Sequence, residues 1–184
     1  MIDLNELEKQ FLAAHVKSGG VAVDFTMGNG NDTRWLSDAV GLGGQVYAFD
    51  IQPQALEKTR ALLTASGCAD NYTLILDSHA NVRDYVTEPI CAGVFNLGYL
   101  PGSDKKVTTL RPSTLAAVTA AVELLDRDGI ILIAVYPGHA EGEAEGRMLD
   151  EALAVYDRRS YTVSKFRIIN SPTSPYFFCV ESRA

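Results

Sequence analysis

The segment Val21–Thr33, VAVDFTMGNGNDT, constrains the fold of this chain more than any other stretch. It begins with a short apolar run that ends in Asp24, continues through Gly28 and Gly30, and leads into an amphipathic segment near Trp35. This order of residues predicts a strand, a tight turn and the start of a helix. Glycine permits positive φ and the close approach of a ligand, and the first turn of a helix presents unpaired N–H groups. The segment therefore predicts a cradle for a nucleotide-like ligand.

The spacing of the glycines distinguishes two classes of ligand. The dinucleotide fingerprint G-x-G-x-x-G has a third glycine beneath the pyrophosphate, and this chain has Thr33 at that position. A ligand without phosphates, such as S-adenosylmethionine (SAM), suits an acid at the strand end better, because Asp24 can attract the amino group of its methionine moiety. A purely structural turn is the alternative, since a G-x-G pair alone is weak evidence.

A second acid follows the next predicted strand. The run Gln45–Phe49 ends in Asp50, and Pro53 marks the first turn of the helix that follows. In a βαβ nucleotide-binding unit, the acid at the end of the second strand accepts hydrogen bonds from the ribose hydroxyls. We therefore expect Asp24 and Asp50 at the carboxyl ends of adjacent parallel strands. Ile51 is expected either against the adenine ring or in the core.

Polar residues also follow three later runs that predict strands. Asp77, Ser78 and His79 follow Tyr72–Leu76; Asn96 and Tyr99 follow Ala92–Phe95; Pro137, Gly138 and His139 follow Ile130–Tyr136. Ligands of open α/β sheets bind along the carboxyl ends of the strands. We expect the first group to contact adenine or the reacting group, the second to mark the acceptor, and the third to cover the site. For Asp77, a cap on the helix that begins near Asn81 is the equal alternative.

The remaining patterns predict how the sheet is completed. Apolar side chains recur at helical spacing within residues 1–20, which predicts an N-terminal helix. The runs Tyr161–Ile169 and Tyr176–Val180 are joined by the polar segment NSPTSP, which predicts an antiparallel hairpin. This ending favours the methyltransferase type of doubly wound α/β sheet over a dehydrogenase half-domain. The length of 184 residues fits a single domain over residues 1–184.

Composition excludes several classes of protein. Hydrophobic residues make up 47% of the chain and charged residues 21%, as in globular proteins. No run of about 18 apolar residues occurs, and the first residues are polar, so we expect no membrane contact and a cytoplasmic location. Three cysteines without C-x-x-C spacing and three scattered histidines predict no metal site.

The net charge of −7 argues against broad contact with nucleic-acid phosphates. If the substrate is RNA, the contact area must be small, or the cations must be local or shared between subunits. Two groups of cations are candidates for phosphate contact, with a solvated surface as the alternative. These groups are Lys105, Lys106 and Arg111, and separately Arg158, Arg159, Lys165 and Arg167.

Five motifs occur in order along the chain: DFTMGNGND, AFDIQ, LDSHAN, FNLGYLPGSDK and YPGH. Together, from about Val21 onward, they resemble the bacterial family labelled putative rRNA methylases, which are SAM-dependent class I methyltransferases of the YtqB or MnmM type. The resemblance implies a Rossmann-like, seven-stranded, mostly parallel sheet with helices on both faces. For characterised members it implies methylation of the 5-aminomethyl group of the tRNA wobble uridine to 5-methylaminomethyl. The implied partner is the anticodon region of tRNA, and a homodimer is compatible with the family.

The resemblance also assigns site residues. Around the methionine end of SAM it places Asp24, Thr26, Gly28, Asn29, Gly30, Asn31, Asp32 and Thr33; around ribose and adenine, Asp50, Ile51 and Gln52; and among the further SAM contacts Asp77, Ser78, His79 and Asn96. The segment that begins at Asn96 occupies the position of the Asn-Pro-Pro-Tyr loop of amino-group methyltransferases. Here Leu97 and Gly98 replace the prolines, so the detailed geometry of that loop does not carry over.

An amine acceptor needs a free lone pair, so a base or a desolvated pocket must favour its neutral form. Our hypothesis is that the carbonyl oxygens of Asn96 accept the hydrogens of the amine, and that Tyr99 packs on the uracil ring. His79, Asp77 or His139 is a candidate for the proton acceptor. The alternatives are a methyltransferase acting on rRNA or on a small molecule, a nucleotide-binding oxidoreductase, and a non-catalytic RNA-binding module.

Overall fold

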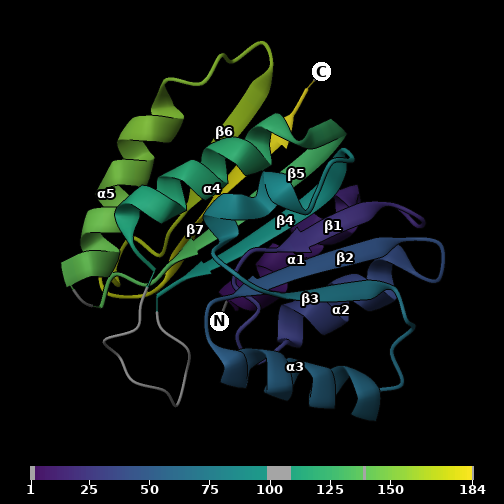
Figure 1. The fold of residues 1–184 in the computed structure, drawn as a ribbon. Helices are drawn as coiled ribbons and strands as arrows, with labels where there is room; N and C mark the ends of the chain where they lie inside the picture. Colours follow the sequence, from purple (N-terminus) through teal and green to yellow (C-terminus); the bar gives the residue numbers. More distant parts are fainter. Residues whose placement is uncertain (1–2, 99–108, 139, 184) are drawn as a thin grey trace.

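The computed structural model describes residues 3–98, 109–138 and 140–183, and its centre is a seven-stranded sheet (Figure 1). The strands are β1 Val21–Asp24, β2 Gln45–Asp50, β3 Tyr72–Leu76, β4 Ile90–Leu97, β5 Leu125–Val135, β6 Tyr161–Phe166 and β7 Tyr176–Ser182. The helices are α1 Leu4–His15, α2 Asn31–Val40, α3 Pro53–Ala65, α4 Arg111–Glu123 and α5 Ala140–Ala154, with a 3₁₀ helix η1 at His79–Asp84.

The strand order is β3-β2-β1-β4-β5-β7-β6. The first five of these strands are parallel, whereas β7 pairs antiparallel with both β5 and β6. The predicted doubly wound sheet with a C-terminal antiparallel hairpin is therefore confirmed. The order reverses between β1 and β4, which is the point where ligands bind in open α/β sheets.

Helices cover both faces of the sheet, as predicted (Figure 1). On one face, Leu12 of α1 and Leu36 of α2 pack against Val46 and Leu132 of the sheet. On the other face, the residues of η1, α4 and α5 pack against a second apolar cluster. Strand β5 is buried on both sides from Ile130 onward, which explains its continuous apolar run.

Strand β5 begins earlier than its apolar run predicts. The apolar run predicts a strand that begins at Ile130, yet residues 126–129 also lie inside β5, and Leu125 already pairs with Ile90. The ladder is irregular between Ile90 and Ala92, and Asp128 has a φ of 61°. An irregular, polar strand segment of this kind resembles a turn in sequence because the same residue types favour both.

Among the described residues, no helix is long and apolar enough to cross a bilayer. The same residues contain no group of three or more His, Cys, Asp or Glu side chains arranged to hold a metal ion.

Candidate functional site

The turn between β1 and α2 is organised around Asp24. One carboxylate oxygen accepts a hydrogen bond from the backbone N–H of Thr26 at 3.1 Å, and the other accepts one from Thr33 Oγ1 at 2.7 Å. The side chain is only 1% exposed. Burial, and then the charges of Asp32 and Asp50, raise the pKa of Asp24 to about 7. Asp24 thus lies beneath the cradle and joins its two ends, while its interaction with a ligand amino group stays a prediction.

The glycines of this turn have positive φ, as predicted: 53° at Gly28 and 83° at Gly30, which is the N-cap of α2. A Cβ at Gly30 would lie 2.7 Å from Thr59 Oγ1 and 3.0 Å from Thr59 Cα. The missing side chain at Gly30 therefore allows α3 to pack closely against the turn. The sequence suggested the approach of a ligand as the reason for this glycine, and the structure shows helix packing.

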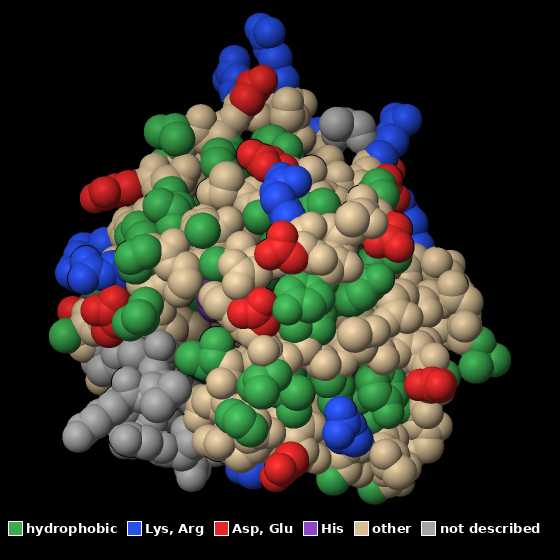
Figure 2. Space-filling model, viewed as in Figure 1, with side chains coloured by type: hydrophobic (Ala, Val, Ile, Leu, Met, Phe, Trp, Pro, Cys, Tyr) green, Lys and Arg blue, Asp and Glu red, His purple; other side chains and the backbone are tan. Residues whose placement is uncertain are grey.

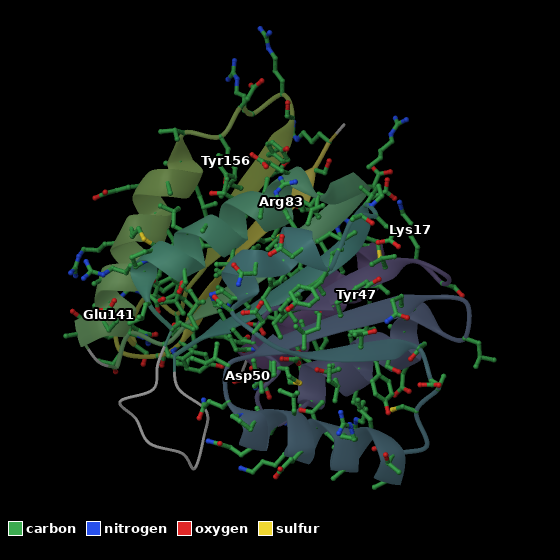
Figure 3. The ribbon with its side chains drawn as sticks, in the orientation of Figure 1. Lys17, Tyr47, Asp50, Arg83, Glu141 and Tyr156 are labelled. Carbon is green, nitrogen blue, oxygen red and sulfur yellow. The ribbon has the colours of Figure 1, made fainter. Side chains whose placement is uncertain are left out.

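Asp50 lies at the end of β2, beside the start of α3 (Figure 3). Its Oδ2 accepts a hydrogen bond from Gly28 N at 3.0 Å, and its Oδ1 accepts one from Gln52 N at 2.9 Å. Asp50 is partly exposed, and each carboxylate oxygen can accept a second hydrogen bond. Ile51 is 58% exposed, so the prediction that it is a core residue is wrong. A contact between Ile51 and adenine stays a prediction.

The segment Asp77–His79 is held mainly by its own neighbours. Asp77 accepts hydrogen bonds from Ser78 N, Asn81 Nδ2 and Tyr85 Oη, and these bonds lower its pKa. Ser78, rather than Asp77, is the N-cap of η1, and its hydroxyl accepts a hydrogen bond from Ala80 N. The structure thus shows a local structural role for both side chains, while their contact with a ligand stays a prediction.

His79 is a buried connection between η1 and the end of β1. Its Nδ1 donates a hydrogen bond to the carbonyl oxygen of Phe25 at 3.0 Å, and its ring meets the Phe95 ring edge-on at 5.9 Å. Burial lowers the pKa of His79 below its ordinary value, so the imidazole is neutral near pH 7. These contacts explain the burial of His79 without any ligand.

Asn96, at the end of β4, joins three elements of the carboxyl edge. Its backbone N–H donates to Thr26 Oγ1 at 2.6 Å, its Nδ2 donates to Asp32 Oδ2 at 2.8 Å, and Tyr136 Oη donates to its Oδ1 at 3.3 Å. We call this group, Thr26, Asp32, Asn96 and Tyr136, the Asn96 junction. These bonds fix the orientation of the Asn96 amide, because the Asp32 carboxylate accepts from its NH₂ group and the Tyr136 hydroxyl donates to its oxygen.

Sequence reasoning did not select Tyr136 as a site residue. It directly follows β5 and precedes Pro137, so the rule that polar groups after a strand line the ligand edge would have found it. Two predicted site residues, Tyr99 and His139, lie outside the described residues. Gly98 and Thr109 flank the segment that contains Tyr99, and the backbone N–H of Thr109 donates a hydrogen bond to the carbonyl oxygen of Gly98 at 3.0 Å.

A hollow of about 500 Å³ adjoins the Asn96 junction. Its walls come from the first turns of α1, from Tyr136 and from the connection between β6 and β7, and include Asp3, Asn5, Glu8 and Ser174. Burial, and then Asp32 and Asp3, raise the pKa of Glu8 to about 7. Burial, followed by the charges of Glu8 and Asp32, raises the pKa of Tyr136. The N-terminal helix therefore delivers an acid to the edge of the site, which no motif predicted.

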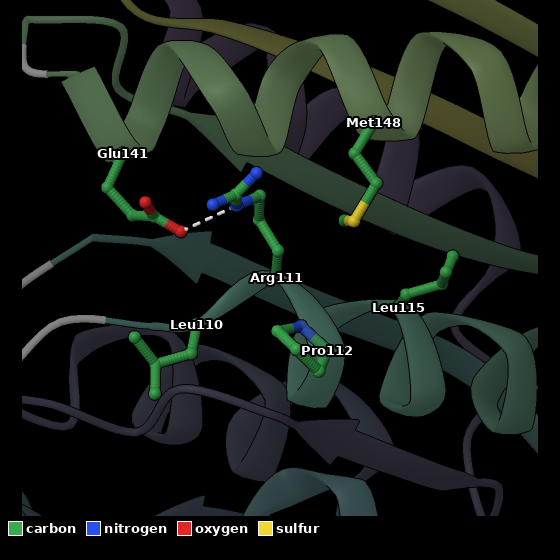
Figure 4. A pocket seen from close by; sticks show the side chains of 6 residues that line it. All are labelled: Leu110, Arg111, Pro112, Leu115, Glu141 and Met148. Carbon is green, nitrogen blue, oxygen red and sulfur yellow. Dashed lines mark hydrogen bonds and ion pairs between the residues drawn. The ribbon is translucent and has the colours of Figure 1, made fainter.

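A second hollow, of about 540 Å³, lies between α4 and α5 (Figure 4). It is lined mainly by apolar side chains, including Leu115 and Met148. Arg111, a candidate phosphate contact, instead pairs with Glu141 at 3.0 Å beside this hollow.

On the face shown in Figure 2, Lys and Arg side chains lie at several places among acidic and neutral surface. Lys165 pairs with Asp150 at 2.6 Å, and Arg167 donates to the carbonyl oxygen of Pro172. Lys105 and Lys106 lie outside the described residues. For an RNA substrate, this arrangement suits a small contact area, which is one of the alternatives that the net charge leaves.

Comparisons with known proteins identify relatives of the whole fold. The family model described as "Putative rRNA methylase" matches residues 46–181. The chloroplastic tRNA (mnm(5)s(2)U34)-methyltransferase of Arabidopsis thaliana is 36% identical over 170 residues, which cover 87% of this chain and 62% of that protein. This chain therefore spans less than two thirds of the length of the plant relative.

Two solved structures are similar over nearly their full length. A structure described as a putative rRNA-methylase from Clostridium thermocellum superposes with a TM-score of 0.96 at 36% identity, covering 99% of this chain and 98% of that one. A putative methyltransferase from Streptococcus mutans, solved in complex with SAH, superposes with a TM-score of 0.90 at 38% identity and covers 99% of both chains.

Proposed function

Because this chain belongs to the putative rRNA methylase family, a family of SAM-dependent methyltransferases, we propose that it transfers a methyl group from SAM to RNA. More specifically, we propose that it methylates the 5-aminomethyl group of the wobble uridine of tRNA to 5-methylaminomethyl. The name of the Arabidopsis relative supports tRNA, whereas the family description supports rRNA. The observation that carries the proposal is the Asn96 junction, which sets hydrogen-bond acceptors at the edge of the cradle.

The residues at the carboxyl edge suit SAM. Asp50 is partly exposed and keeps lone pairs for ribose hydroxyls, and Ile51 offers apolar surface next to it for adenine. Burial, and then the charge of Asp32, raise the pKa of Asp24, so a cation bound nearby would stabilise its charged form. SAM carries both an ammonium group and a sulfonium group. When bound, it supplies a methyl group that is already activated for transfer.

Alignment of the acceptor is then the main task of the protein. Asn96 Oδ1 accepts one hydrogen bond from Tyr136 and can accept a second from an amine of the substrate. Asp32 holds the other end of the same amide, so the oxygen keeps its direction. In this proposal, Asn96 orients the lone pair of the amine, and Asp32 and Thr26 position Asn96. Packing of Tyr99 on the uracil ring of the substrate remains part of the proposal.

Nucleoside mass spectrometry of RNA tests the substrate. We expect tRNA from cells that lack the protein to accumulate 5-aminomethyluridine derivatives, and the purified protein to convert them when SAM is added. Methyl groups found only in rRNA, or only in small molecules, would contradict the tRNA proposal.

The role of Asn96 is tested with Asn96→Ala. We expect methyl transfer to fall about a hundredfold, as when one orienting hydrogen bond is removed from an active site. SAH affinity should change less than threefold, so SAH binding is the internal control for an intact cradle. Wild-type turnover by this variant would remove Asn96 from the chemistry.

Three features stay proposals: a single domain over residues 1–184, a homodimer and a cytoplasmic location. Size-exclusion chromatography with light scattering tests the dimer, since a mass of about 40 kDa is twice the 19.9 kDa of the chain.

A further inference from the structure

We propose that the hollow beside the Asn96 junction is the acceptor subsite, and that Glu8 of α1 takes a proton from the ammonium group of the substrate. This inference rests on the proposed function, because it assigns the acceptor side of the same reaction. It gives the N-terminal helix a chemical role in addition to packing.

The hollow and the Asn96 junction share Tyr136. This side chain lines the hollow, and its hydroxyl reaches Asn96 Oδ1 at 3.3 Å. A group that enters the hollow therefore comes to the residue that we propose aligns the acceptor. The hollow between α4 and α5 has no such connection, since neither Asn96 nor any of its three junction partners lines it.

The two sides of the hollow differ in chemistry. The start of α1 contributes a mainly polar wall, which includes Glu8, Asp3 and Asn5 as well as Leu4. The connection between β6 and β7 contributes a mainly apolar wall, which includes Ile168 and Pro175 as well as Ser174. A pyrimidine with a charged aminomethyl arm has the same division, because the ring is flat and largely apolar on its faces and the arm is cationic. The apolar wall suits the ring, and the acidic wall suits the arm.

The charges that face Glu8 are mostly negative. They are Asp3 at the N-cap of α1, Lys9 on α1 and Asp32 on α2, while Tyr136 approaches from the end of β5. Lys9 is the one cation among the described groups that influence Glu8. A second cation in the hollow would therefore be attracted, and an ammonium group is the cation that the substrate supplies.

The same surroundings prepare Glu8 to accept a proton. The pKa of Glu8, about 7, lies closer to the pKa of an alkylammonium group than the pKa of an ordinary carboxyl group does. In the proposed step, one N–H bond of the ammonium breaks, its electron pair stays on nitrogen as the lone pair, and an O–H bond forms on Glu8. Glu8 then releases the proton to water before the next turnover. Neither His79 nor Asp77 is required, and both already have structural partners.

The test compares Glu8→Gln with Glu6→Gln. Both remove one carboxylate from α1, but Glu6 is exposed and does not line the hollow. For each variant and for wild type, we would measure SAH affinity by calorimetry and methyl transfer to tRNA that carries 5-aminomethyluridine, from pH 6 to pH 10. Tyr136→Phe is a second variant, which removes only the hydroxyl group.

We expect Glu8→Gln to lower kcat/KM about a hundredfold at pH 7, within the range for loss of a general base. Its activity should recover as pH approaches the pKa of the amine, because the free amine then needs no base. SAH affinity should stay within twofold, Tyr136→Phe should raise KM, and Glu6→Gln should match wild type.

Two results would overturn the inference while leaving the proposed function intact. One is wild-type activity and pH dependence in Glu8→Gln. The other is a parallel loss of SAH affinity, which would place Glu8 in the donor site. A wild-type protein that binds SAH but methylates no RNA would instead refute the proposed function, and with it this inference.

Discussion

Replacing Gly30 with alanine should destabilise the protein for two separable reasons. Gly30 has a φ of 83°, where an alanine costs about 1–2 kcal/mol. A Cβ there would also lie 2.7 Å from Thr59 Oγ1, 2.8 Å from Thr59 Cγ2 and 3.0 Å from Thr59 Cα. Because the last of these is a backbone atom of α3, a rotamer change alone does not relieve the overlap. Overpacking of this kind costs about 1–3 kcal/mol.

Gly67 provides the matched control. It follows α3 with a φ of 68°, and a Cβ there would meet no atom within 4 Å. Gly67→Ala should therefore show only the conformational cost, reduced by about 0.4–1 kcal/mol because alanine also restricts the unfolded chain. We expect a loss of about 1 kcal/mol at Gly67 and about 2–4 kcal/mol at Gly30, so the difference isolates the contact with Thr59.

Equilibrium unfolding in urea measures both losses. With a slope of about 2 kcal/mol per molar urea, the midpoint should fall by about 0.5 M for Gly67→Ala and by about 1–2 M for Gly30→Ala. SAH affinity should fall only in Gly30→Ala, because Thr59 Oγ1 donates to the carbonyl oxygen of Gly28 in the same turn. Equal midpoints for the two variants would refute the argument that α3 packs on this turn through Gly30.

Three other measurements test the charged and polar groups of the site. Asp50→Asn should weaken SAH binding about ten- to hundredfold, as expected for hydrogen bonds to a charged group, and unchanged calorimetry would exclude the ribose contact. Folding raises the pKa of Asp24 to about 7, so the folded protein keeps a proton that the unfolded chain loses; the free energy of unfolding should fall as pH rises from about 4 to about 7, and less so in Asp24→Asn. A wild-type slope in that variant would assign the effect to other groups. The ring of His79 should titrate below 6.5 by NMR, and a higher midpoint would contradict its burial as the dominant cause.

The sheet could be predicted from the sequence because its signals are local. The apolar run before Asp24, the glycines of the turn and the run before Asp50 define a βαβ unit without any knowledge of distant residues. The hairpin at the end of the chain was predictable for the same reason. The early start of β5 was not, since Asp126–Gly129 carries turn-forming residues that the structure keeps within the strand.

The acceptor side of the site depends on residues that are far apart in the chain. Glu8 and Tyr136 are separated by more than a hundred positions, and they line one hollow only because α1 packs against the face of the sheet that carries the end of β5. Periodicity predicts that α1 is amphipathic, but it does not predict which polar side chain at the edge of its apolar face meets the site. A polar residue directly after a strand is a stronger indication of a site residue, and Tyr136 occupies such a position.

The two acids that the sequence treats as a pair have different surroundings, and the hydroxyl group of Thr33 contributes to the difference. Thr33 lies nine positions after Asp24. The turn between them brings Thr33 back to the end of β1, where its hydroxyl donates a hydrogen bond to the Asp24 carboxylate. Within the described part of the chain, Asp50 accepts its hydrogen bonds from backbone N–H groups, and it stays partly exposed. With Asp24 fixed below the cradle and Asp32, Asp50 and Glu8 around it, the edge of the sheet concentrates negative charge that the described protein groups compensate only in part. Such a site favours a ligand that brings its own positive charge, and a sulfonium donor and an ammonium acceptor each bring one.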